Sequence, residues 1–484
     1  MPCSRLAVFV ILMLFVILTL CSIATPRAIG VERTRVPAND PAVNQPVDLR
    51  SRWQPGDVFR VDAKFEVGGQ LIIEEKKQPK EIPMSVVAHL RYDERLLPTS
   101  SDGPTGDRAA QDVPQLRALR HYDTAEATIK IAKSGKRPTL PEDSRQLVAE
   151  LVGGAVTIAS PNRSIRRETL DLVAIPGSSI ALDRLLPEKQ LRIGDTWKHD
   201  SQAIQALVGI DSVAVCEVES ALVGLVGDER KFAQIKLAGT VQGAIDGVAT
   251  EIQLKASYLF DSKLGRITRF NLAMKEKRGA GPIGSGVDVV AKLQLEMDPV
   301  DTAESTAGTT VSTPPSTDLV LPLAHVHGPT GMRFLHGREW FVTSEQRERV
   351  ILRHVADGEL TAQCQIAVLP QLPDGQTMTV DQFEKDVRFA LGKRLEQIVA
   401  ANQWRTESGL ACTRIVAAGK IEELPIEWRY YLLVGEDGRR VAATVTVEGA
   451  LVERLNNAER EIVESLVLPP ENTPPAEQAA RVPQ

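Results

Sequence analysis

Alternating hydrophobic and polar residues dominate the first half of the chain. Residues 58–67, VFRVDAKFEV, place apolar side chains at every second position between charged ones, which is typical of a strand with one buried face. Further runs that predict strands cover residues 71–75, 84–92, 125–132, 213–225, 232–242, 250–260, 267–276 and 287–297. Turn residues such as Gly227-Asp228 and Gly265 separate several of these runs. We therefore expect a large, curved antiparallel sheet.

Helical patterns in this half are few. Pro141 followed by two acidic residues predicts a helix that continues through Val152, because this order of residues is common at helix starts. Residues 179–186 predict a second, short helix.

The pattern changes in the second half. Strands are predicted at residues 339–343, 349–355, 360–369, 412–418, 426–434 and 440–447. Thr379 and Gln382 have the spacing of a capping box, and apolar residues then recur at helical spacing to about Asn402. Residues 451–466 predict a final helix, again with one apolar stripe that should pack on a sheet. The expected class is α+β: a large curved antiparallel sheet domain with a few helices, followed by a smaller α+β sandwich.

The first residues are distinct from everything that follows. Residues 6–24 carry no charge, follow Arg5 and end in Ser22-Ile23-Ala24, which is the pattern of a secretory signal peptide. The run of 19 residues is close to the roughly 20 that span a bilayer, so an uncleaved signal anchor is the alternative. We expect an exported protein, periplasmic or extracytoplasmic, with possible membrane attachment through this segment.

Composition divides the chain of 484 residues further. Pro-rich and Ser/Thr-rich stretches lack hydrophobic periodicity and indicate a tether, a linker and a tail. The predicted organisation is a signal peptide or anchor at 1–28, a tether at 29–48, a mainly antiparallel β domain at 49–298, a linker at 299–332, an α+β domain at 333–468 and a disordered tail at 469–484.

Charge and cysteine content narrow the possible partners and links. The formal net charge is −6, which argues against nucleic acid as a partner because phosphates require a basic face. Cys216 lies in an apolar run and is expected in the core. Cys364 and Cys412 fall in one predicted domain, so a disulfide between them is possible in an oxidising compartment; two buried free thiols are the alternative.

Motifs of known chemistry are missing from the sequence. It holds no GxSxG, HExxH, CxxC or phosphate-binding glycine loop, so we expect no catalytic, cofactor or metal site and no enzymatic activity. His325 and His327 could share a metal if the segment is extended, but their place beside the linker favours a solvated segment. Residues 163–167, RSIRR, are expected to form a charged surface, and the glycine-rich residues 281–286 a hairpin connection.

An aromatic cluster lies in EWRYYLL, residues 427–433. Alternation places Trp428 and Tyr430 on one face and Tyr431 on the other. These side chains can anchor an interface or fill a core. The flanking leucines favour the core, and Trp428 and Tyr430 remain possible interface aromatics.

Two stretches resemble known families. Residues 177–197, with LDRLLPEKQLRIGDTW, and residues 258–270, YLFDSKLGRITRF, resemble uncharacterised exported proteins of planctomycete-type bacteria; these motifs imply structure and no catalytic residues. The helix at Thr379, the phrase PIEWRYYLLVGEDGRRVAATVTVE at 425–448 and SLVL at 465–468 resemble the PsbP-like α+β fold. That resemblance implies a non-catalytic binding or assembly module.

Two functions follow as hypotheses. The first is a non-enzymatic cell-envelope protein whose second domain binds another, unknown envelope protein. The alternative is a carrier of a hydrophobic ligand or lipid, because a large curved antiparallel sheet can enclose an apolar cavity, as in half-barrel lipoprotein carriers.

Overall fold

The structure is a computed structural model that describes residues 45–75, 78–98, 116–228, 231–300, 321–371 and 378–468. The predicted signal segment, most of the tether and the linker, and the C-terminal tail lie outside these residues, and their assignments stay predictions. Within the described ranges, no helix is long and apolar enough to cross a membrane.

The expected α+β class is wrong. Strands hold 59% of the described residues and helices 14%, so the protein is β-rich. Helix α3 (Val380–Leu391) ends where Gly392 takes a φ of +53°, and residues predicted to continue it form strand β18 (Leu395–Arg405). Only the short 3-10 turn η3 (Glu142–Ser144) and strand β5 (Gln146–Val152) occupy the predicted helix at 141–152. The five residues 147–151 are all buried, so both faces of β5 are covered and the period-two signal is lost.

Twelve of the strands in the described ranges form one antiparallel sheet. The order is β6-β5-β3-β2-β1-β12-β11-β10-β9-β8-β7, with β4 beside β3. The strands are β1 (Val58–Glu75), β2 (Gln78–Leu97), β3 (Leu116–Ile131), β4 (Ser134–Lys136), β5, β6 (Ala155–Ala159), β7 (Thr196–Lys198), β8 (Ser212–Val226), β9 (Phe232–Ile245), β10 (Val248–Asp261), β11 (Arg266–Arg278) and β12 (Gly286–Pro299). The predicted long hairpin strands are present. Of the glycine-rich residues 281–286, the first five lie in the connection between β11 and β12, and Gly286 begins β12.

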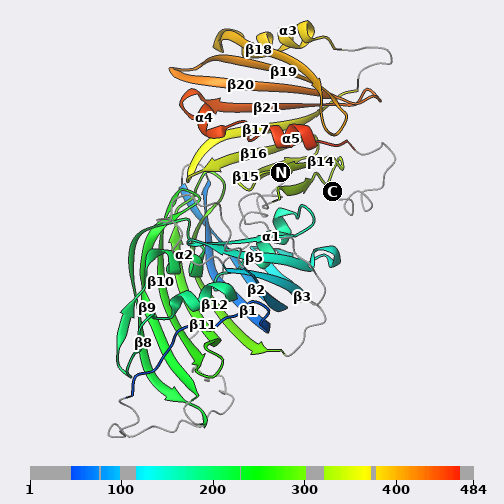
Figure 1. The fold of residues 1–484 in the computed structure, drawn as a ribbon. Helices are drawn as coiled ribbons and strands as arrows, with labels where there is room; N and C mark the ends of the chain where they lie inside the picture. The colour runs from blue at the N-terminus through cyan, green and yellow to red at the C-terminus, as the bar shows by residue number, and fades with distance from the viewer. Residues whose placement is uncertain are drawn as a thin grey trace, which may run out of the picture.

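This first sheet is strongly curved, and short helices lie on its inner side (Figure 1). They are α1 (Arg167–Val173), the 3-10 helix η4 (Ser179–Leu185) and α2 (Ser201–Val208). Helix α2 begins where the Asp200 carboxylate accepts a hydrogen bond from the Ala203 N–H and ends at Gly209 with φ +72°, as its capping residues dictate. Apolar side chains at alternate positions of the strands join those of the helices in one continuous core.

The second sheet has seven strands in the described ranges, in the order β15-β16-β17-β21-β20-β19-β18. They are β15 (Trp340–Gln346), β16 (Arg349–Ala356), β17 (Glu359–Leu369), β18, β19 (Ala411–Ile421), β20 (Leu424–Val434) and β21 (Arg440–Glu448). Helix α3 packs on one face, and the short helices α4 (Val452–Leu455) and α5 (Arg460–Ser465) pack on the other. Strands β13 (Leu323–Val326) and β14 (Arg333–His336) form a separate pair.

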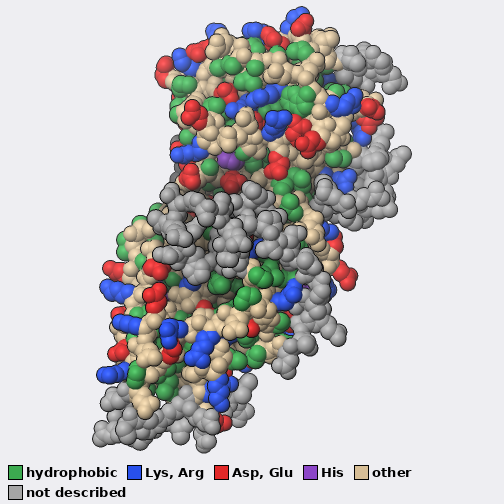
Figure 2. Space-filling model, viewed as in Figure 1, with side chains coloured by type: hydrophobic (Ala, Val, Ile, Leu, Met, Phe, Trp, Pro, Cys, Tyr) green, Lys and Arg blue, Asp and Glu red, His purple; other side chains and the backbone are tan. Residues whose placement is uncertain are grey.

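Charges of both signs are interspersed over the visible face of both sheets (Figure 2). The described part of that face shows no continuous basic stripe.

Candidate functional site

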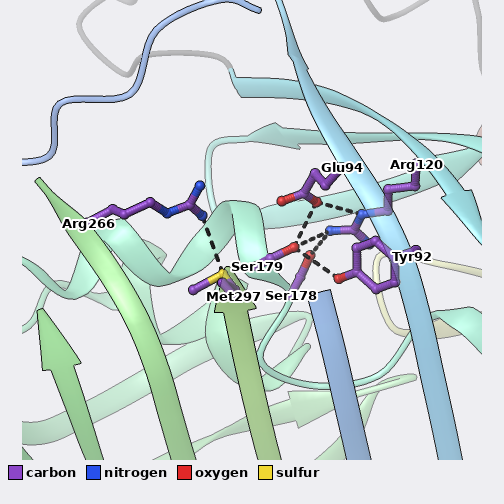
Figure 3. Close-up of polar contacts among 7 residues, drawn as sticks. All are labelled: Tyr92, Glu94, Arg120, Ser178, Ser179, Arg266 and Met297. Carbon is purple, nitrogen blue, oxygen red and sulfur yellow. Dashed lines mark hydrogen bonds and ion pairs between the residues drawn. The ribbon is translucent and has the colours of Figure 1, made fainter. Parts of the chain in front are cut away.

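A buried ionic cluster lies between η4 and the first sheet (Figure 3). Glu94 on β2 and Arg120 on β3 are direct cross-strand partners, and the Arg120 Nε lies 2.8 Å from Oε2 of Glu94. The Arg120 Nη2 also donates to the hydroxyls of Ser178 and Ser179, at 2.9 and 3.0 Å. The Tyr92 hydroxyl lies 3.0 Å from that of Ser179. Both charged side chains are almost fully buried, so the pair depends on these hydrogen bonds.

Arg266, at the start of β11, lies near this cluster and is bound differently. Its guanidinium carbon lies 3.7 Å from the centroid of the Trp53 ring and 3.6 Å from that of the Phe59 ring, and the two rings are tilted by 39° to each other. Nη2 donates to the Met297 sulfur at 3.3 Å (Figure 3), whereas Nε and Nη1 have no hydrogen-bond partner among the described residues. The side chain is 2% exposed, and this burial lowers the pKa of Arg266, with the charge of Asp183 opposing the shift.

The two nearby carboxylates are already engaged. Asp183 accepts from the Ser51 hydroxyl at 2.6 Å, and burial raises the pKa of Asp183. Glu94 accepts from Arg120 and, through the same oxygen, from Ser179 at 2.7 Å. Its other oxygen has no hydrogen-bond partner among the described residues. The positive charge of Arg266 is therefore surrounded by aromatic faces and is not directly ion-paired in the described structure.

A strap, residues 45–57, runs over this end of the sheet. Val47 exchanges two backbone hydrogen bonds with Leu191, at 2.7 and 3.0 Å, and the Arg52 N–H donates to the Gly265 carbonyl at 2.9 Å. Trp53 of the strap is only partly buried. Arg266 thus lies one side chain below the surface.

A second buried chain of hydrogen bonds joins a serine and a histidine. The Ser220 hydroxyl lies 2.8 Å from Nε2 of His199 and 3.0 Å from the Tyr258 hydroxyl. The distance to His199 is one at which a histidine base could activate a serine nucleophile. Ser220 has no exposed surface, and burial lowers the pKa of His199 to about 4. The sequence gives no sign of this pair, because the two residues are brought together only by pairing of β7 and β8. Its burial fits a hydrogen-bonded core.

A polar surface pocket of about 430 Å³ lies beside β3. An ion pair of 2.6 Å between Arg163 and Asp143 joins two of its walls. Burial alone would raise the pKa of Asp143, but hydrogen bonds from Arg163 and Ser144 outweigh it and lower the pKa. The lining residues are His121, Glu142, Asp143, Arg145, Gln146, Ser160, Pro161, Asn162 and Arg163. Cationic and acidic groups are mixed in the lining and point to no single ligand class.

The two sheets meet at a joint of polar contacts. The Arg167 Nη2 donates to the Arg338 carbonyl at 2.6 Å, and the Arg338 Nη2 donates to the Ile158 carbonyl at 2.7 Å. Arg353 donates to the Pro282 carbonyl. The expectation that residues 163–167 form a charged surface is therefore wrong for Arg167, which also lies 4.9 Å from the centroid of the Phe341 ring.

Substitution of Gly247 by Ala should loosen this joint. Gly247 has a φ of +75°, and a Cβ there would overlap the carbonyl oxygen of Gly358 in the second sheet. Gly153, also in a hairpin turn, has a φ of +57° and nothing within 4 Å of a Cβ, so Gly153→Ala is the matched control. Both variants carry about 1 kcal/mol of backbone strain, and only Gly247→Ala should increase the radius of gyration in small-angle scattering. Equal values for both variants would contradict this account.

Asp171 should make stability depend on pH. Burial raises its pKa from 3.8 to about 7, against the opposing charge of Arg167, while Glu168 and Asp246 add to the rise. Between about pH 4 and pH 7 the folded chain therefore holds a proton that the unfolded chain releases, and the free energy of unfolding falls as pH rises. Asp171→Asn removes this contribution, so its stability gain over the wild type should grow from pH 4 to pH 7 in urea titrations. A gain that does not vary with pH would show that Asp171 does not titrate in this way.

The histidine pair is not in a solvated linker, so that expectation is wrong. His327 is fully buried, with Nδ1 2.6 Å from the Thr330 hydroxyl and Nε2 2.7 Å from the Gln346 carbonyl. His325 packs against the Phe334 ring, and burial lowers its pKa to about 3. Across the described ranges, no group of three or more His, Cys, Asp or Glu residues could hold a metal ion.

The possible disulfide between Cys364 and Cys412 is not formed. Both thiols are free and buried. Cys364 lies on β17 and Cys412 on β19, and β21 and β20 lie between these strands. Three strand spacings amount to about 14 Å, whereas a disulfide requires Cα atoms within about 7 Å. Burial raises the pKa of both thiols, that of Cys412 to about 12.

Trp428 and Tyr430 do lie on one face of β20, and Tyr431 lies on the other. Trp428 is buried beneath α3 with Phe383 and Val387, and Tyr430 packs at the edge of the same cluster. Their place is in the core, which is the reading that the flanking leucines favoured. The interface role is therefore not supported for Trp428.

Comparisons with known proteins add no argument about function. No family model matches the sequence, and no curated protein matches it. Among solved structures, lipovitellin aligns with 54% of this chain and 27% of its own, at 8% identity and a TM-score of 0.30. DynF from Micromonospora chersina aligns with 56% of this chain and 92% of its own, at 8% identity and a TM-score of 0.15. OmpF from Salmonella typhi reaches a TM-score of 0.11 at 9% identity, over 82% of this chain and 99% of its own. The planctomycete-type and PsbP-like resemblances stay predictions.

Proposed function

We propose that this protein is an exported, non-enzymatic carrier of an amphiphilic ligand, which it binds on the concave face of the first sheet. The observation that carries the proposal is the combination of that apolar face with a buried, incompletely bonded Arg266 at its strap-covered end. Ligand sites are mostly apolar concave surfaces with a small number of placed polar groups.

The ligand would take the place of the cover segment, residues 174–191, which contains η4. The Gly177 backbone packs so closely on the sheet that a Cβ would overlap the Leu293 side chain. Ile180, Leu182 and Leu185 of this segment are fully buried in the core that it shares with the first sheet. A short 3-10 helix has little stability of its own, so the packing of its side chains holds the segment in place.

The free energy lost by exposing the apolar side chains of η4 is similar in size to the free energy gained by burying an alkyl chain. Exposing the three side chains of η4 costs roughly 5–9 kcal/mol, at about 1.5–3 kcal/mol each. Burying a twelve-carbon chain returns about 9 kcal/mol, at about 0.8 kcal/mol per methylene. A ligand of this length can therefore offset the lost burial of these three side chains, and its headgroup would also have to compensate the hydrogen bonds that join Ser178 and Ser179 to the Glu94–Arg120 pair.

Native mass spectrometry tests the proposal directly. Protein purified from its exported compartment should carry an additional mass that solvent extraction releases as an amphiphile. Stripped protein should take up dodecanoate at a ratio of one to one. A stripped and reloaded sample that binds neither dodecanoate nor a neutral dodecyl detergent would contradict carriage.

A second candidate function, binding of an envelope protein, is favoured by Phe389. This side chain on α3 is 90% exposed and points away from the residues that pack on the sheet. The neighbouring edge strand β18 has two register irregularities, which protect an edge against strand addition. A partner would therefore bind through the side chains of α3 and not by adding a strand to β18.

Photo-crosslinking tests this second candidate. A photo-crosslinking residue at position 389 should capture one defined envelope protein, whereas the same residue at Lys385 should not; equal labelling by both would reject this surface.

A further inference from the structure

We infer that Arg266 binds the headgroup of the ligand and that this headgroup is a single anion, a carboxylate or a phosphate. This inference rests on the proposed function, because it assigns the charge of the ligand that the concave face would carry.

Two nitrogen atoms of the Arg266 guanidinium, Nε and Nη1, have no hydrogen-bond partner among the described residues. The rings of Trp53 and Phe59 both contact the guanidinium and form a clamp on it, with centroids 3.7 and 3.6 Å from its carbon and 5.9 Å from each other, and hydrogen bonds of a guanidinium lie in its plane. In that plane only Nη2 has a partner, the weak acceptor Met297 sulfur. The clamp therefore fixes the orientation of the N–H groups while leaving Nε and Nη1 without an acceptor among the described residues. Carboxylates and phosphates are the acceptors that match an arginine best.

The surrounding charges favour one added negative charge. Glu94 is already neutralised by Arg120, and the raised pKa of Asp183 indicates that burial disfavours its charged form. A buried charge without a hydrogen-bonded partner is costly. An anion that binds Arg266 would therefore remove this cost without first displacing another ion-pair partner. A second negative charge on the ligand would find no second unpaired cation among the described residues of this cluster, because Arg120 is already paired with Glu94.

The strap provides the route of entry. Trp53 belongs to the strap and forms one side of the clamp. The strap is bonded through Val47 to Leu191 at the end of the cover segment. Lifting the strap would therefore expose Arg266 and release the cover segment together, and the alkyl chain would follow along the concave face.

Calorimetric titration tests the headgroup assignment with dodecanoate, dodecyl phosphate, neutral dodecyl maltoside and inorganic phosphate. The wild type should bind the two anionic amphiphiles at least tenfold more tightly than dodecyl maltoside. Arg266→Met should reduce this preference to less than threefold. Arg269→Met is the matched control, since Arg269 lies on the same strand with its charge paired to Asp298 at 2.9 Å, and it should keep the preference. Arg266→Gln provides a second variant, and near-ultraviolet circular dichroism checks that each variant is folded.

The possible outcomes separate the two claims. If no amphiphile binds the wild type, carriage itself fails, and the headgroup assignment fails with it. If the wild type binds neutral and anionic amphiphiles equally, or the Arg266 variants keep the anionic preference, the headgroup assignment is overturned while carriage stands. Inorganic phosphate that binds as tightly as dodecyl phosphate would show a site for free anions and overturn the amphiphile assignment.

Discussion

Replacing Arg120 with methionine is expected to lower the free energy of unfolding by about 3–5 kcal/mol. The variant leaves Glu94 charged and buried, and two serine hydroxyls lose their donor. Removing one member of a buried, hydrogen-bonded pair has this large effect because the remaining charge cannot be resolvated. Urea denaturation followed by circular dichroism measures the loss.

Arg266→Met is the matched comparison, because it removes an arginine of similar burial from the same region. It takes away a charge that is not directly ion-paired, and methionine retains contact with the two rings. We expect a change within about 1 kcal/mol, since lost cation–π attraction and relieved desolvation oppose each other. If both variants lost the same free energy, Arg266 would be a structural residue and the distinction between the two arginines would be wrong.

The second large effect is expected in the second sheet, on replacing Trp340 with alanine. Trp340 is fully buried, and its indole N–H donates to the Ala458 carbonyl at 3.1 Å, which ties β15 to the segment between α4 and α5. Truncation creates a cavity and leaves that carbonyl without its donor, for a loss of about 3–5 kcal/mol.

Trp404→Ala is its control. Trp404 is only partly buried and donates to Glu464 at 3.0 Å, so a loss of roughly 1–2 kcal/mol is expected from its smaller buried area. Thermal unfolding should show the Trp340 effect in the transition of the second sheet. A Trp340 variant no less stable than the Trp404 variant would contradict the packing described for α4 and α5.

Much of the sheet was predictable because one face of each strand is buried. The alternation in 58–67 and the run of long strands from 213 to 297 correspond to β1 and β8–β12. The pattern failed where both faces or neither face is covered. Strand β5 is buried on both faces, and β18, at the edge of its sheet, is mostly exposed, so period two is absent from the first and weak in the second.

The candidate site could not be predicted from the sequence. Arg120 and Glu94 are 26 residues apart and meet only through the pairing of β2 and β3. Trp53 and Arg266 come from opposite ends of the first domain and meet only because the strap is bonded to Gly265. The available signal was weak: Glu94 lies two residues beyond the strand predicted at 84–92, and its position continues the buried alternation of that strand. The solvated position predicted for His325 and the possible disulfide of Cys412 were wrong for a related reason. Nearness in sequence or in one domain does not determine nearness in space.

Hydrogen–deuterium exchange with and without dodecanoate tests most directly whether the concave face carries a ligand. We expect faster exchange on binding for the strap, residues 45–57, and the cover segment, residues 174–191, with unchanged exchange in β8–β12. Unchanged exchange of both segments at saturating dodecanoate, or slower exchange confined to the polar pocket beside β3, would contradict it.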